Sequence, residues 1–148
     1  MKIKFLSAIE ARWYFTQPDE YAQKLPLSNL QMICPENPTI EGYQEVFLKS
    51  FDDFEEDQKI DMLNFAENLI WLDLEIKVAR TDGSHALDIT QTRKDVILIT
   101  GGYISEKTFV HEVYHILSRK NPNVTPELAK LFGYKKVKPQ KITHPSFL

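Results

Sequence analysis

The sequence predicts an α+β fold, in which a small twisted sheet is backed by a long helix and followed by a second helix that carries the functional residues. Residues 52–72 repeat apolar side chains every three or four positions, as an amphipathic helix does. Residues 74–100 hold three short segments rich in β-branched residues, which are typical of strands. Helical spacing returns after Ser105. Helices therefore flank a group of strands, the order of an α+β domain.

One domain is expected over residues 1–148, because a chain of this length that is 43% hydrophobic can bury one core. Within it, residues 1–50 are predicted to form a loop-rich arm, since four prolines interrupt residues 17–50. The short elements expected in this arm are a helix or strand over 1–16, a short helix near Asp19–Lys24, and a helix or strand over Glu41–Phe51.

The long helix and the strands follow in order. Asp52 or Asp53 can cap the helix at its N-terminus. Charged and apolar residues alternate in the first strand, which predicts one face in solvent. The segments expected after the helix are a strand at Leu74–Arg80, a turn at Asp82-Gly83, a strand at Ala86–Thr92, a turn at Thr92–Lys94 and a strand at Val96–Thr100.

An HExxH motif, His111-Glu112-Val113-Tyr114-His115, lies in the second predicted helix. Ser105 can cap this helix, and its apolar stripe largely avoids the two histidines and the glutamate. Because residues four apart share one face of a helix, both imidazole rings can bind one Zn²⁺. Glu112 then projects beside the ion, where its carboxylate can accept a proton from a water molecule.

The motif and its context resemble the zincin metallopeptidases. The resemblance extends over Val96–Lys120, where a strand, the pair Gly101-Gly102 and the HExxH helix follow one another. In that family a strand at the sheet edge binds the substrate peptide antiparallel, which implies that Val96–Thr100 is an edge strand. The continuation, Ser118–Pro122 and Leu131–Tyr134, is similar to a group of little-characterised bacterial HExxH proteins with the pattern HxLSRxNP…IGF.

A third protein ligand is expected, because catalytic zinc usually has three. The metzincin arrangement is excluded, since position 121 is Asn where that subclass has its third His. Gluzincin-like members use a Glu on the next helix. Glu127 is the first acidic residue after the motif and begins a short predicted helix, Pro126–Phe132. His144 is the alternative, and a group in sequence beyond Leu148 is another.

The resemblance implies a zinc-dependent peptidase that hydrolyses peptide bonds through a Zn²⁺-activated water, with Glu112 as the general base. The tetrahedral oxyanion needs a donor, and the candidates are Tyr103, Tyr114, Tyr134 and His144. Tyr134 and His144 rank first, and Tyr114 is expected to point away from the metal. The alternatives are a non-catalytic zincin-like module that binds zinc or another protein, and a non-enzymatic domain with a coincidental motif. The expected metal ligands are His111, His115 and Glu127.

Composition limits the partners. A net charge of −3 without a basic stripe argues against nucleic acid. No apolar stretch approaches about 20 residues, which argues against a membrane span, and Glu10 and Arg12 interrupt the N-terminal apolar run too early for a signal peptide. Cys34 is the single cysteine, which suits a reducing compartment. We expect a soluble protein, cytoplasmic or exported by a signal-less route, that acts on a protein or peptide substrate.

Overall fold

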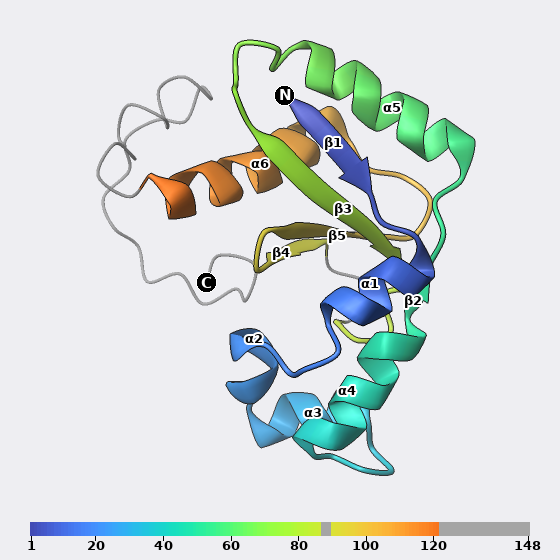
Figure 1. Cartoon of the computed structure of the whole chain (residues 1–148). Helices are drawn as coiled ribbons and strands as arrows, with labels where there is room; N and C mark the ends of the chain where they lie inside the picture. Colours follow the sequence, from blue (N-terminus) through green and yellow to red (C-terminus); the bar gives the residue numbers. More distant parts are fainter. Residues whose placement is uncertain (87–89, 122–148) are drawn as a thin grey trace.

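The computed structural model describes residues 1–86 and 90–121 and confirms the predicted α+β class (Figure 1). No helix in these two ranges is long and apolar enough to cross a lipid bilayer. The strands are β1 (Lys2–Phe5), β2 (Phe51–Asp52), β3 (Glu75–Thr81), β4 (Gln91–Arg93) and β5 (Val96–Thr100). The helices are α1 (Ala8–Tyr14), α2 (Glu20–Gln23), α3 (Leu27–Ile33), α4 (Ile40–Lys49), α5 (Glu56–Glu67) and α6 (Glu106–Lys120).

The strands form a mixed sheet with the order β1-β3-β5-β4. β1, β3 and β5 run parallel, β4 runs antiparallel to β5, and β2 pairs with the end of β3. β5 thus lies inside the sheet, and the prediction that Val96–Thr100 is an edge strand is wrong. Its unbroken apolar run suits a parallel strand that is covered on both faces. Among residues 1–86 and 90–121, the edge strand on this side is β4.

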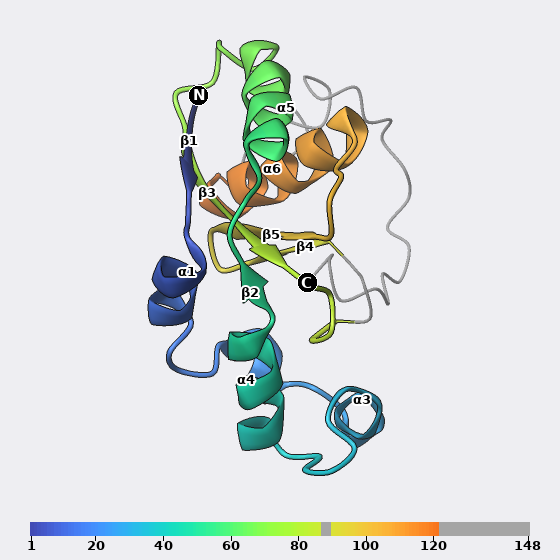
Figure 2. The same cartoon turned by 90° about the vertical axis from the view of Figure 1, so that its right-hand side faces the viewer.

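Alternate residues of β3 and β5 enter two apolar clusters on opposite faces of the sheet. One cluster joins Val78 and Ile97 to α5 and α6. The other joins Ala79 and Leu98 to α1 and α4. The prediction that β3 has one face in solvent holds for its first half, where Glu75 is exposed and Lys77 is partly exposed. It is wrong for the second half, where Ala79 and Thr81 on the same face are buried. Figures 1 and 2 show α5 and α6 together at one end of the molecule and α3 and α4 at the other.

Residues 1–50 contain one strand and four helices, so the prediction of a loop-rich arm is also wrong. Three of the four prolines stand at helix starts, and Pro35 directly follows the C-cap of α3. Pro26 is the N-cap of α3, and Pro18 and Pro38 directly precede the N-caps of α2 and α4. Proline suits such positions, because the first residues of a helix have no use for a backbone N–H donor and favour its fixed φ angle.

The long helix begins later than predicted, at Glu56. Its N-terminus is closed by Gln58, whose side chain accepts a hydrogen bond from the backbone N–H of Glu55 at 3.0 Å. Neither of the predicted caps serves this helix. Asp52 belongs to β2, and Asp53 accepts a hydrogen bond from the backbone N–H of Ala8 at 2.7 Å. The N-cap is Glu55, two residues after the later of the two predicted caps.

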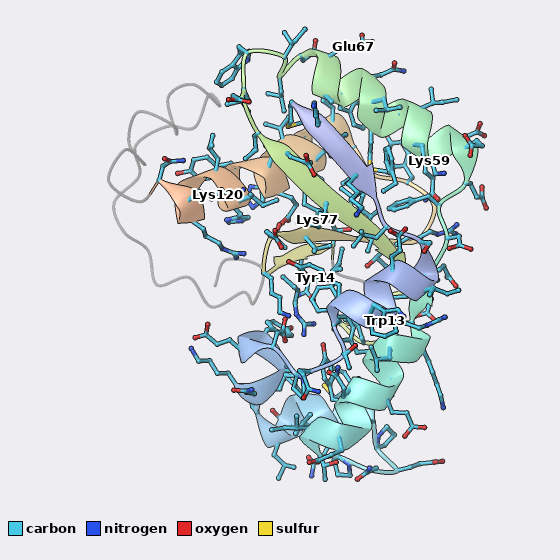
Figure 3. The ribbon with its side chains drawn as sticks, viewed as in Figure 1. Trp13, Tyr14, Lys59, Glu67, Lys77 and Lys120 are labelled. Atoms are coloured by element: carbon cyan, nitrogen blue, oxygen red, sulfur yellow. The ribbon has the colours of Figure 1, made fainter. Side chains whose placement is uncertain are left out.

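The turn between β4 and β5 lies at Lys94 and Asp95 and overlaps the predicted turn, Thr92–Lys94, only at Lys94. Lys94 has a positive φ of 55°. Asp95 anchors the turn to α1 and β3, because its carboxylate accepts hydrogen bonds from the Tyr14 hydroxyl and from the Lys77 ammonium group, the latter at 3.0 Å. Figure 3 shows Tyr14 and Lys77 close together at this part of the sheet. Part of the strand predicted at Ala86–Thr92 falls outside the described residues.

Candidate metal centre

The motif lies in the middle of α6, and local sequence explains the helix. Ser105 caps its N-terminus, where the side-chain oxygen accepts a hydrogen bond from the backbone N–H of Thr108 at 3.1 Å. Basic residues in the last turn complement the helix dipole. Phe109 and Val113 are fully buried in the cluster shared with α5 and the sheet. This buried stripe fixes the rotation of α6 and leaves the two histidines on a different, partly exposed face.

His111, Glu112 and His115 converge on one point. The Nε2 atoms of the two histidines are 2.9 Å apart, and ligand atoms from all three side chains lie within 4.8 Å of one another. Two nitrogens bound to one tetrahedral zinc at 2.0–2.1 Å would be about 3.3 Å apart. The rings therefore need only a small separation to bind a single ion. Two imidazoles and a carboxylate are donors that suit Zn²⁺.

Burial sets the protonation of the two histidines. It lowers the pKa of His111 and, together with the charges of His111 and Arg119, lowers the pKa of His115 to about 4. Both rings are consequently neutral at pH 7. A neutral imidazole has a free lone pair, which is the form that binds a metal ion.

Glu112 is 2% exposed, and a residue of the sheet holds its carboxylate in place. The Thr92 hydroxyl donates a hydrogen bond of 2.6 Å to its Oε2 atom. Burial raises the pKa of Glu112 to about 7, although the Thr92 hydroxyl and the Arg119 charge both act to lower it. The carboxyl group can therefore gain or lose a proton near neutral pH, as a general base must.

Arg119 ties the end of α6 to the edge strand. Its Nη1 atom donates to the carbonyl oxygens of Thr92 and Lys94 at 3.4 and 3.2 Å. In an antiparallel pair, alternate residues direct their N–H and C=O groups away from the neighbouring strand. The two carbonyls that meet Arg119 are two residues apart, so they mark the outer edge of β4. This edge runs beside the motif helix.

A pocket of about 780 Å³ adjoins this edge. We name it the α2–β4 pocket, and it is lined by Asp19, Glu20, Tyr21, Lys24, Leu25, Pro26, Asn29, Thr92, Arg93, Lys94 and Arg119. No sequence pattern predicted this pocket, because its walls come from segments about 70 residues apart. Thr92, the partner of Glu112, was missed for the same reason. The only sequence feature that pointed to Thr92 was its position in a polar segment before a predicted strand.

The structure brings together three of the predicted site residues, the two histidines and Glu112. Among residues 1–86 and 90–121, no further His, Cys, Asp or Glu joins this group. Glu127, Tyr134 and His144 lie outside the described residues, so their roles stay predictions. Comparisons of the chain with models of known families, with curated proteins and with solved structures find no match. Residue chemistry and geometry are what bear on its function.

Proposed function

We propose that the protein is a zinc-dependent peptidase, with His111 and His115 as metal ligands. One observation carries this proposal: two neutral ring nitrogens lie 2.9 Å apart, and a carboxylate lies within reach of both. When bound there, Zn²⁺ supplies a Lewis acid that activates water and polarises a carbonyl group. Glu127 is proposed as the third ligand, with His144 as the alternative. Tyr134 and His144 are the proposed oxyanion donors.

Glu112 does the proton chemistry in this proposal. Its carboxylate accepts a proton from the attacking water and returns it to the leaving amine. Thr92 supports this role, because its hydroxyl holds Oε2 at 2.6 Å and so fixes the orientation of the carboxylate. A fixed base does not have to be ordered again in each catalytic cycle, which favours the reaction.

The substrate is proposed to lie along β4, in place of the β5 strand that the sequence suggested. Extended peptides commonly bind by adding a strand to the edge of a sheet. β4 is the edge strand beside α6, and Thr92 in its centre contacts Glu112 directly. A peptide paired with this strand would therefore pass close to the base. Arg119 donates a hydrogen bond to the outer carbonyl of Thr92. When a peptide binds, Arg119 would give up this hydrogen bond and contact the substrate instead.

A non-catalytic zinc-binding module is the second candidate. The observation that favours it is the burial of Glu112, which is 2% exposed and already has a hydrogen bond from Thr92. A carboxylate in that position can hold the histidine-bearing helix against the sheet without meeting a substrate. The two candidates share the metal ligands and differ in whether peptide bonds are cleaved.

The test combines elemental analysis with digestion of a peptide mixture. We expect one equivalent of zinc in the wild-type protein and a loss of metal affinity of at least about 10–100-fold in His111→Ala and His115→Ala. Glu112→Gln should keep zinc and lose about 10²–10⁴-fold in cleavage rate. Glu106→Gln is the matched control, since it makes the same change in the first turn of the same helix.

The outcomes separate the candidates. Zinc that depends on both histidines, with cleavage that depends on Glu112 and not on Glu106, supports the peptidase. Zinc without cleavage of any peptide supports the non-catalytic module. A protein that takes up no zinc at neutral pH, or a Glu112→Gln variant that cleaves at the wild-type rate, contradicts the proposal.

A further inference from the structure

The α2–β4 pocket lies one helical turn beyond the candidate metal centre. Arg119, which lines it, follows His115 by four residues on α6, a rise of about 6 Å. Thr92 lines the same pocket and donates its hydrogen bond to Glu112. An extended peptide advances about 3.3 Å per residue. A peptide along β4 therefore places a side chain in this pocket about two residues from the bond at Glu112.

The pocket carries an excess of positive charge. Among its described lining residues, the basic ones are Lys24, Arg93, Lys94 and Arg119, and the acidic ones are Asp19 and Glu20. Both acidic groups are already engaged, because Asp19 pairs with Arg93 at 2.5 Å and Glu20 pairs with Lys24 at 2.6 Å. Lys94 and Arg119 are the other two basic residues of the lining, and the charge of Arg119 also acts on Glu112.

Lys94 lies in the turn between β4 and β5 and lines the pocket. It is exposed, and its ammonium group lies 3.4 Å from the Tyr14 carbonyl and over the faces of two rings. Its charge also acts on the Asp19 carboxylate of the same pocket. Its φ of 55° is in the left-handed region, where glycine or asparagine is the usual residue. The turn therefore presents the Lys94 ammonium group at this end of the pocket.

We propose that the α2–β4 pocket binds the carboxylate of an acidic side chain, aspartate or glutamate, of the substrate peptide, which makes the enzyme selective for acidic sequences. This selectivity rests on the proposed peptidase function, because it assumes a peptide along β4. Lys94 supplies the principal charge, and Arg119 adds a second positive group beside the base. The apolar surfaces of Leu25 and Pro26 line the remainder and pack against the methylene groups of the bound side chain.

The first test measures binding separately from cleavage. The full-length Glu112→Gln protein is titrated with acetylated, amidated penta-alanine peptides that carry Glu or Gln at the centre, and backbone amide signals are followed by NMR. We expect the Glu peptide to bind about fivefold more tightly, which is the effect of one partly exposed ion pair. The preference should weaken as salt rises from 0.05 to 0.5 M, because added ions screen the pair.

Variants of Lys94 identify the source of the preference. Lys94→Gly should abolish it without loss of folding, since glycine relieves the positive φ, and a thermal melt checks this. Lys94→Arg should keep the preference. Lys2→Ala removes the same charge from the opposite edge of the sheet and is the matched control. Equal affinities for the Glu and Gln peptides, or a preference that survives Lys94→Gly, would overturn the proposal.

A second measurement distinguishes failure of the pocket from failure of the peptidase. The wild-type protein, loaded with zinc, is given a peptide library, and the cleaved positions are identified by mass spectrometry. Cleavage enriched about two residues from Asp or Glu, and lost in Lys94→Gly, supports both proposals. Cleavage without acidic preference overturns the pocket and leaves the peptidase. A Lys94-dependent binding preference with no cleavage supports the pocket and rejects the peptidase.

Discussion

Asp19 and Arg93 lie 74 positions apart in the chain and form a bidentate ion pair, with Arg93 Nε and Nη2 donating to the two carboxylate oxygens at 2.8 and 2.5 Å. Their side chains are 4% and 1% exposed. Arg93 also donates to the Tyr43 hydroxyl at 2.6 Å, and its guanidinium carbon lies 4.3 Å from the ring centres of Tyr21 and Phe47. The pair joins the residue that caps α2 to strand β4 and so forms a wall of the α2–β4 pocket.

Asp19→Asn should destabilise the protein by about 3 kcal/mol, because it leaves the buried charge of Arg93 without its partner. Asparagine keeps the helix cap, since Asn and Asp are equally good at that position. The free energy of unfolding is measured with urea. Glu20→Gln is the control, because Glu20 is an exposed neighbour in a surface pair with Lys24, and it should leave stability unchanged. Equal effects of the two changes would contradict the role of the buried pair.

Thr92→Val should cost about 1–2 kcal/mol of stability at pH 8 in the metal-free protein, because it removes the hydroxyl that donates to the buried Glu112 carboxylate. Valine keeps the shape of the side chain, so packing is preserved. Thr92→Ser restores the hydroxyl and should recover most of the loss. Urea unfolding of the two variants provides the comparison. The importance of the hydrogen bond is rejected if Ser and Val are equally destabilising.

His85 should make the protein less stable in acid. Its side chain is fully buried, and burial, followed by the charge of Arg93, lowers its pKa to about 3. The unfolded chain has a histidine pKa near 6.5, so between pH 6.5 and 3 the unfolded state binds the extra proton. The free energy of unfolding is therefore unaffected by His85 titration above pH 6.5 and decreases as the pH falls from 6.5 toward 3.

The check is a comparison of urea unfolding for wild type and His85→Gln at pH 7 and pH 4.5. The wild type should lose on the order of 2 kcal/mol more than the variant over this interval, because glutamine does not titrate. Glu112 is common to both proteins, so its own titration cancels in the difference. Parallel losses in the two proteins would show that His85 does not take up a proton on unfolding.

Glu127→Ala should lower zinc affinity more than His144→Ala. The reason is drawn from the sequence, in which Glu127 begins a predicted helix a short connection after the motif helix, and elements joined by about 4–6 residues are usually neighbours. A tail histidine must order more chain, at about 1–2 kcal/mol per residue. Zinc content after dialysis is the measurement. Zinc lost only from His144→Ala would reverse the assignment, and zinc kept by both would place the ligand elsewhere.

Local patterns in the sequence were sufficient for the α+β class and for the placement of His111 and His115 on one face of a helix. The spacing of His111 and His115 implied one helix face, and the structure places their ring nitrogens 2.9 Å apart. The buried stripe of α6 and the apolar run of β5 were likewise evident from neighbouring residues. These features depend on interactions within a few positions of the chain, so periodicity and capping residues predict them.

Tertiary structure decided which strand is at the edge and where the pocket lies. The apolar pattern of β5 predicts burial but does not say which strands pair with it, and the structure places β3 and β4 on its two sides. The charge of Arg93 predicts exposure to solvent. The residue is only 2% exposed, because it forms an ion pair with Asp19, which lies 74 positions away in the chain. A burial of this kind depends on a distant partner, and no local pattern of residues contains that information.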